Sequence, residues 1–199
     1  AMGFESMLTD GAKHVLGWKS PNFVYTNVMN PRLKLLLKNS RLSDDLTLRF
    51  SDHSWHEWPL TADKYARWLK DSTQDSEIVN LFMNYETFGE NQLAETGIFE
   101  FMRSLPEYIF STTDFEFLTP SEAVKKHQPV APLHVPYPIS WADEEKDITG
   151  WLGNELQNEA FEELFKIQPK VEALNDPELN EDYSRLQASD HFYYMRTKL

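Results

Sequence analysis

Residues 81–92 hold the residue types and the spacing that could do chemistry. An apolar run ends at Met83, and Asn84 and Glu86 follow before an aromatic ring and a glycine. In an α/β barrel, strands deliver polar side chains to the rim at their carboxyl ends, where active sites are built. Amide and carboxyl groups at such a rim could bind a substrate or exchange protons with it. The alternative that the pattern leaves open is a turn whose polar groups, those of Asn84 and Glu86, satisfy its own backbone.

Two short apolar segments predict the strands that must position these groups. Residues 46–50 alternate between apolar and polar, and residues 78–83 are a nearly continuous apolar run. A run of this kind suits a strand buried on both faces, in a parallel sheet covered by helices. Amphipathic helices are predicted to begin at Thr61 and near Ala94. The alternation of strands and helices therefore predicts an α/β fold with right-handed crossovers.

The composition of the chain changes after residue 128. Four prolines lie within residues 129–138, and proline fixes φ and removes a hydrogen-bond donor. We therefore expect an extended connector over residues 129–140. It would separate an α/β unit over residues 1–128 from an α-helical unit over residues 141–199.

The second unit shows only helical patterns. Apolar residues recur at helical spacing over residues 148–165. Ser140, with Asp143 three residues later, resembles a capping box that would begin the first helix. Pro169 is predicted to end that stretch of helix, and a last helix is expected over residues 179–195.

Composition and charge exclude several classes of function. The chain has 199 residues, no cysteine and a formal net charge of −13. The negative charge disfavours nucleic acid and an anionic membrane surface as partners. The mean hydropathy is −0.55, and no apolar run approaches the ~20 residues of a membrane span. Without cysteine there is no disulfide framework, thiol nucleophile or Cys-ligated zinc, and a cytoplasmic location is the expectation.

Both ends of the chain resemble the interior of a folded protein. The first residues lack the basic and apolar regions of a signal peptide. The last eight residues are rich in aromatic side chains, whereas a free terminus is usually polar. We therefore expect the chain to be a segment of a longer protein.

A metal hydrolase is one alternative from another class. His53, His56 and Glu57 lie close in sequence, and Asp44 and Asp45 are nearby. Zinc hydrolases usually place two histidines at i and i+4 on a helix, whereas these lie at i and i+3 without an evident third ligand. The pattern therefore disfavours a metal site.

A serine hydrolase is excluded by spacing. Ser189, Asp190 and His191 have the residue types of a catalytic triad, but adjacent residues cannot form a proton relay. No Gly-x-Ser-x-Gly pattern occurs in the chain.

Residues 82–91 resemble a motif of glycoside hydrolase family 57, the α-amylase-like enzymes, which reads Phe-Met-Asp-Tyr-Glu-Thr-Phe-Gly-Glu-His. Other segments resemble the same subgroup in the same order: residues 3–11, 18–22, 42–51, 142–154 and 189–195. The resemblance runs through essentially the whole chain. It implies a partial, distorted (β/α)7 barrel followed by an α-helical domain. It also implies retaining hydrolysis or transfer at α-1,4-glucan linkages, without a cofactor or a metal.

The resemblance implies that this chain is inactive. Retaining chemistry needs two carboxyl groups ~5–5.5 Å apart. The implied nucleophile is a glutamate upstream of Ala1, and Asn84 stands where the family has its acid/base aspartate. An amide cannot cycle a proton near neutral pH, and losing a positioned acid removes ~10²–10⁴ in rate. Glu86 would lie about 6.6 Å further along a strand, too far to substitute, and Asn91 replaces the usual histidine.

The resemblance also implies where an α-glucan or malto-oligosaccharide would bind. The candidate substrate-binding residues are Glu86, Phe88, Trp55, Asp190 and Tyr193. Aromatic rings could stack on a pyranose face, and carboxylates could bind sugar hydroxyls. The alternative for Tyr193 is a place in a helical core, and for Asp190 a helix cap. A non-catalytic α-glucan-binding or regulatory protein on the same fold is the alternative function.

Overall fold

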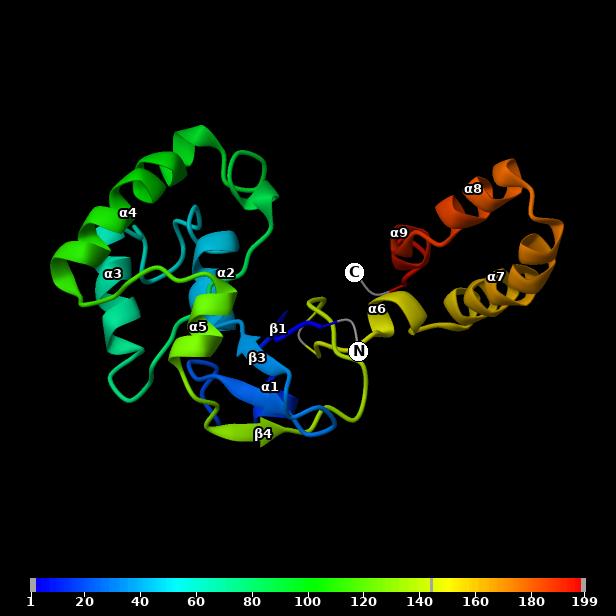
Figure 1. The fold of residues 1–199 in the computed structure, drawn as a ribbon. Helices are drawn as coiled ribbons and strands as arrows, with labels where there is room; N and C mark the ends of the chain where they lie inside the picture. The colour runs from blue at the N-terminus through cyan, green and yellow to red at the C-terminus, as the bar shows by residue number, and fades with distance from the viewer. Residues whose placement is uncertain (1–2, 144, 198–199) are drawn as a thin grey trace. The chain divides into compact units, whose positions relative to one another are not determined.

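The computed structural model describes residues 3–143 and 145–197, which divide into two compact units at Pro136 and Tyr137 (Figure 1). The first unit contains β1 (Ser6–Thr9), α1 (Lys13–Leu16), β2 (Tyr25–Asn27), β3 (Lys34–Leu37), α2 (Ser40–Thr47), α3 (Ala62–Asp71), η1 (Tyr85–Thr87), η2 (Ala94–Thr96), α4 (Ile98–Thr112), α5 (Pro120–Lys126) and β4 (Ala131–Leu133). The second contains α6 (Thr149–Leu152), α7 (Glu155–Leu174), α8 (Pro177–Leu186) and α9 (Ser189–Tyr193).

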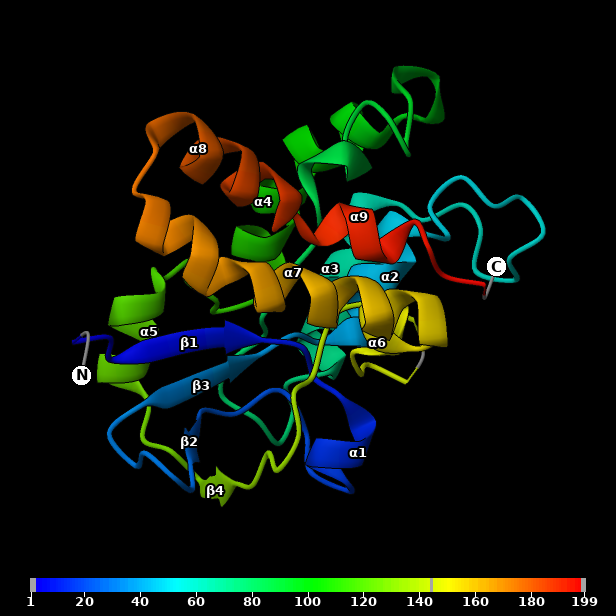
Figure 2. The ribbon, with the colours of Figure 1, turned by 90° about the vertical axis from the view of Figure 1, so that its right-hand side faces the viewer.

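The four strands form one mixed sheet in the order β1-β3-β2-β4, as Figure 2 shows. β1 pairs with β3 and β2 pairs with β4 in parallel, whereas β2 and β3 pair antiparallel. The prediction of a parallel sheet is therefore wrong for the β2–β3 pair, because only six residues join these two strands and a parallel pair needs a long crossover. β4 lies within the predicted proline-rich connector. The α/β class is confirmed, and the partial barrel remains a prediction.

Both faces of this sheet are covered. Successive side chains of a strand point to opposite faces, and in β3 Leu35 and Leu37 pack with Leu16 of α1. Leu36, between them, packs with Ala123 and Val124 of α5 on the other face. The three buried leucines explain why so short a strand is central in the sheet.

Helices α2, α3 and α4 build the main core of the first unit. Tyr65 of α3 is buried against Phe101 of α4, and its hydroxyl donates to the Leu42 carbonyl oxygen of α2 at 2.8 Å. Since α3 begins at Ala62 and α4 at Ile98, the two predicted amphipathic helices are confirmed.

The predicted strand over residues 46–50 is wrong. Leu42, Leu46 and Phe50 are all buried in the same core at a spacing of four residues, which is the period of a helix face. Asn39 caps the helix that begins at Ser40, since its side-chain oxygen accepts from the Leu42 amide at 3.1 Å. The short alternating pattern was the end of a helix rather than a strand.

Residues 78–83 are extended but pair with no strand in the described part of the chain. One backbone and one side-chain hydrogen bond at Asn80 hold the segment instead. The Asn80 carbonyl oxygen accepts from the Asn39 backbone amide at 2.8 Å, and the Asn80 side chain donates to the Leu37 carbonyl oxygen at 3.1 Å. Val79, Leu81 and Met83 pack on the helical core. The strand prediction, which the nearly continuous apolar run of residues 78–83 suggested, is therefore wrong.

In the second unit, α7 and α8 form a helical hairpin. α7 continues through Pro169 to Leu174, so the predicted helix end at Pro169 is wrong. Proline removes one backbone bond, but the packing of Leu164 and Val171 on either side keeps the helix continuous. Asn175, at φ 47°, ends the helix in the left-handed conformation.

The remaining elements of this unit differ from the sequence prediction at two points. The Ser140 hydroxyl bonds within a loop, to the Ala142 amide and the Asp147 carbonyl oxygen, and the first helix begins only at Thr149. The predicted last helix is two helices, α8 and α9, separated by residues 187–188. No helix in residues 3–143 and 145–197 is long and apolar enough to span a membrane.

Replacement of Asn39 by alanine should lower the free energy of unfolding by about 2–4 kcal/mol. The variant loses the cap of α2, worth about 1 kcal/mol, and leaves the buried Asn22 side-chain oxygen without its donor at 3.0 Å, which costs about 1–3 kcal/mol more. Urea denaturation measures the difference. Asn30→Ala, at an exposed asparagine, is the control, and an equal effect of both changes would contradict the proposed role of Asn39.

Candidate functional site

The predicted catalytic segment folds into a closed loop over residues 84–92. Its backbone amides satisfy one another: Thr87 donates to Asn84 at 3.1 Å, Asn91 to Glu86 at 2.7 Å, and Gln92 to Thr87 at 3.1 Å. These bonds use backbone groups and leave the Asn84 and Glu86 side chains outside the loop, where both are exposed. The Asn84 side chain does not cap the turn that it begins.

Gln92 anchors this loop to α2. Its side-chain Nε2 donates to the Thr47 carbonyl oxygen at the end of that helix, at 3.1 Å. Phe88 adds an apolar contact with the helical core. The sequence gives no signal for this role of Gln92, because its partner lies 45 residues away.

Two buried polar atoms of the loop have no hydrogen-bond partner among the described residues. They are Thr87 Oγ1 and Gln92 Oε1. Leaving such an atom unpaired costs about 1–3 kcal/mol. Local exceptions of this kind are expected at functional sites rather than in a core built only for stability.

The position of Glu86 relative to Asn84 differs from the strand spacing expected from the sequence. Asn84 and Glu86 were expected on one face of a strand, but residues 85–87 form the 3₁₀ turn η1. Asn84 precedes this turn in an extended conformation, whereas Glu86 lies inside it, so the period of two that would put both side chains on one face of a strand does not apply. Tyr85, between them, is 94% exposed.

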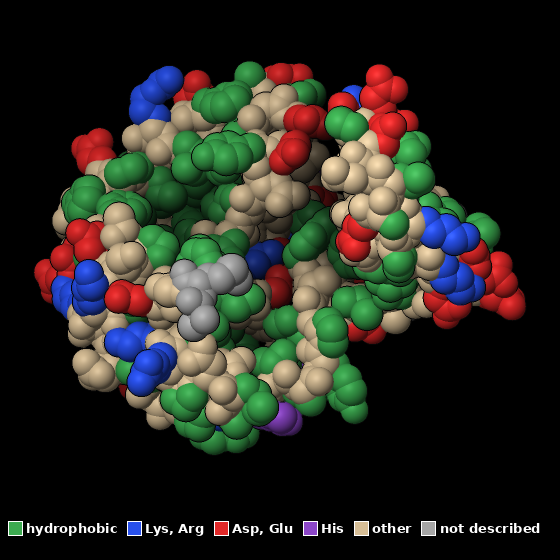
Figure 3. Space-filling view, turned by 45° about the vertical axis from the view of Figure 1, so that its right-hand side comes forward, with side chains coloured by type: hydrophobic (Ala, Val, Ile, Leu, Met, Phe, Trp, Pro, Cys, Tyr) green, Lys and Arg blue, Asp and Glu red, His purple; other side chains and the backbone are tan. Residues whose placement is uncertain are grey.

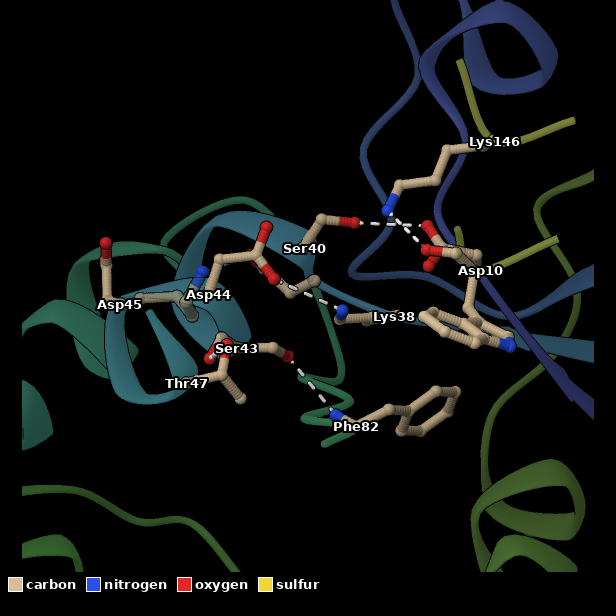
Figure 4. Close-up of polar contacts among 12 residues, drawn as sticks. Asp10, Lys38, Ser40, Ser43, Asp44, Asp45, Thr47, Phe82 and Lys146 are labelled. Carbon is tan, nitrogen blue, oxygen red and sulfur yellow. Dashed lines mark hydrogen bonds and ion pairs between the residues drawn. The ribbon is translucent and has the colours of Figure 1, made fainter. Parts of the chain in front are cut away.

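A second polar group gathers where β1 and β3 end (Figure 4). Asp10 follows β1 and Lys38 follows β3, and since the two strands are parallel these residues share one edge of the sheet. Lys38 Nζ lies 3.2 Å from Asp44 Oδ1, and the Ser40 hydroxyl lies 3.3 Å from Asp10 Oδ1. The hydroxyl of Ser43 in α2 accepts from the Phe82 amide at 3.2 Å, and this bond joins the segment leading to Asn84 to α2.

The sequence held a signal for this edge. Asp10 and Lys38 are polar residues that directly follow short strands, the same pattern that singled out Asn84. Lys38 directly follows the leucine-rich strand β3, but no motif in the sequence distinguishes it from other lysines.

Asp45, beside this group, is buried and paired with Arg49. The Arg49 guanidinium donates to Asp45 Oδ1 at 2.6 Å. Burial raises the pKa of Asp45 above its usual value, and the bond to Arg49 offsets only part of this effect.

The candidates for a metal site do not come together. His53 stacks on Trp58 with ring centroids 4.2 Å apart, and His56 lies 3.5 Å from Glu57. Asp44 is paired with Lys38. Within residues 3–143 and 145–197, no three His, Cys, Asp or Glu side chains are grouped to hold a metal ion.

Trp55 is half-buried, with its ring edge-to-face on Trp68 at 5.9 Å. It packs against the same helical core as Phe88. The first unit thus places Trp55 and the loop with Asn84, Glu86 and Phe88 around one core. This packing leaves only part of the Trp55 and Phe88 rings accessible to a ligand.

The other two candidates belong to the second unit. Tyr193 is half-buried, with its ring centroid 5.4 Å from that of Trp151. Asp190 is exposed in the first turn of α9, and that helix has no side-chain cap. The alternative of Asp190 as a cap is therefore wrong. His191 bonds to the Arg185 carbonyl oxygen at 3.1 Å and takes no part in a relay.

Negative charge is concentrated on the second unit. Residues 141–199 carry 14 acidic and 6 basic side chains, and Figure 3 shows acidic side chains on the outer surface of these helices. Eight of the acidic residues lie at exposed positions of α7 and α8, as a solvated helix face requires.

Comparison with known proteins gives two matches. The family model described as "Glycosyl hydrolase family 57" matches residues 1–136. A protein of Methanocaldococcus jannaschii described as "Putative alpha-amylase" is 42% identical over 207 residues, which covers 99% of this chain and 44% of that protein. The chain therefore spans less than half the length of this relative. No solved structure gives a significant match.

Replacement of Asp45 by asparagine should change how stability depends on pH. Because the pKa of Asp45 is raised in the native state, its contribution to stability is fully present below its unfolded pKa of about 4. The contribution is lost as the pH rises through the raised native pKa. Between about pH 4 and 7, the stability of the variant relative to the unmodified chain should therefore increase. Urea denaturation across this range measures the difference, and a difference independent of pH would contradict the expectation.

Proposed function

Because the chain belongs to glycosyl hydrolase family 57, we propose that the protein binds α-1,4-linked glucans in a partial (β/α)7 barrel, with Asn84 at the acid/base position. The barrel strands and helices would occupy residues 1–128, and a helical domain residues 141–199. The family match supports the proposal because it includes both the Asn84 loop and the polar edge formed by Asp10 and Lys38.

The observation that carries the proposal is an exposed amide on an anchored loop. Asn84 projects from a loop whose backbone is internally bonded and which Gln92 and Phe88 tie to the core. An amide held in this way can donate to and accept from sugar hydroxyls. It cannot protonate a leaving group. The proposed consequence is that glucan binds without efficient turnover.

The other candidate residues would contribute to binding. Glu86 is an exposed carboxylate beside Asn84, and a carboxylate accepts strong hydrogen bonds from hydroxyl groups. Phe88 and Trp55 are half-buried, so only their outer edges could contact a sugar. Asp190 and Tyr193 would act from the helical unit, through a carboxylate and an aromatic ring respectively.

Replacement of Asn84 by aspartate tests this proposal in the complete native protein. Release of short sugars from maltoheptaose is followed by chromatography. The unmodified protein should release little, and Asn84→Asp should release at least ~10² times more, because the change restores a group that can cycle a proton. Asn91→Asp, the same chemical change at another exposed position of the loop, is the matched control and should remain silent.

A non-catalytic glucan-binding protein is the second candidate, and the amide at Asn84 favours it. In that case neither the unmodified protein nor Asn84→Asp would release sugars, although both would bind maltoheptaose. Equal and substantial turnover by the two proteins would contradict the role given to Asn84.

A further inference from the structure

A group of aromatic rings lies on the second unit, outside the Asn84 loop. The Trp141 ring stands edge-to-face on Trp151 at 5.9 Å and is tilted against Tyr193 at 6.3 Å. The Arg196 guanidinium lies over the Tyr193 ring, 4.1 Å from its centroid. These four side chains, together with Asp143, are called the Trp141 surface below.

Trp141 is the exposed ring of this surface. It is 61% exposed, whereas Trp151 and Tyr193, which its ring contacts, are half-buried. An indole ring that remains exposed to water does not contribute the favourable free energy that its burial would give. An exposed ring held by contacts with two other rings is suited to stacking on the apolar face of a ligand ring.

Polar groups flank the exposed ring. An Arg196 nitrogen lies 3.4 Å from Asp143 Oδ1, and both side chains are about one-third exposed. The Arg196 guanidinium has five N–H donors, and among the described residues this contact to Asp143 is its hydrogen bond. The pair therefore presents further donors and acceptors outward. Since its two charges oppose each other, it suits a neutral polyhydroxyl ligand rather than an ion.

The hollow beneath these groups is too small for a sugar. It has a volume of about 20 Å³ and is lined by Asp143, Thr149, Asn154 and Arg196, among others. That volume holds about one water molecule. A ligand must therefore lie on the outer surface, against Trp141.

The surface is held in place by two side-chain amides, of which that of Gln157 is buried. The Gln157 side chain donates to the Phe192 carbonyl oxygen at 2.8 Å, and the Asn154 side chain donates to the Met195 carbonyl oxygen at 3.0 Å. Both bonds fix the segment that carries Tyr193 and Arg196. A surface fixed before binding loses little entropy when a ligand arrives.

We propose that the Trp141 surface is a sugar-binding subsite that takes one pyranose ring of an α-glucan. The ring stacks on Trp141, Arg196 donates to its hydroxyl oxygens, and Asp143 accepts from its hydroxyl groups. The proposal rests on the proposed function for the substrate class, but not on turnover or on the role of Asn84.

Affinity electrophoresis of the complete native protein, in gels with and without soluble starch, tests the subsite. Trp141→Ala should weaken the retardation by starch at least about tenfold in apparent dissociation constant. Trp18→Ala is the matched control, because Trp18 is 92% exposed and lies in the first unit. Arg196→Met should weaken binding in the same direction. Unchanged thermal unfolding of the Trp141 variant establishes that it is folded.

The outcomes separate this proposal from the one before it. Retardation of the unmodified protein that is lost in Trp141→Ala and kept in Trp18→Ala supports the subsite. Retardation that is equal in the unmodified protein, Trp141→Ala and Trp18→Ala overturns the subsite and leaves glucan binding intact. Absence of retardation in the unmodified protein overturns the substrate class, and the subsite with it. Equal losses in both tryptophan variants would show non-specific adhesion and would also overturn the subsite.

Discussion

Every polar group of Asn39 is used, and the arrangement of the first unit depends on these bonds. Its backbone amide holds the segment at Asn80, its side-chain oxygen caps α2, and its side-chain nitrogen donates to Asn22. Asn22 in turn donates to the Ser72 carbonyl oxygen after α3. A buried amide with both ends bonded fixes its neighbours in one orientation, because any alternative leaves a polar group unpaired. The sheet, α2 and the segment leading to Asn84 therefore keep one relative position.

The second unit uses the same device at Gln157, which is fully buried. Its side-chain oxygen accepts from the Gly153 and Asn154 amides at the start of α7, and its nitrogen donates to the Gly150 and Phe192 carbonyl oxygens. One side chain thus joins α6, α7 and α9. The apolar core of this unit is small, with Leu164, Tyr183 and Phe192 as its buried members among the described residues. Specific hydrogen bonds therefore carry much of the orientation that packing provides in the first unit.

The exposed groups of both units owe their positions to these buried amides. Asn84 follows a segment held by Asn39 and Asn80, and Arg196 follows one held by Asn154 and Gln157. Binding groups placed on anchored loops are typical of proteins in which a rigid scaffold carries function at its surface. The same arrangement explains why the amide at Asn84 can be tolerated. An exposed side chain that makes no bond to the fold can change chemically without changing stability.

The sequence by itself determined the α/β class, the amphipathic helices of residues 62–71 and 98–112, and the family, because periodic apolar faces and long motifs are local patterns. It did not determine whether residues 46–50 and 78–83 were strands. An apolar pattern of five or six residues is compatible with a strand, a helix or an unpaired extended segment. The shared core with Leu42 decides the structure of residues 46–50, and the bond to Asn39 decides that of residues 78–83. Tertiary structure alone brought Lys38 to Asp44, Gln92 to Thr47, and Arg196 to Asp143, since each bond depends on how separate elements come together in space.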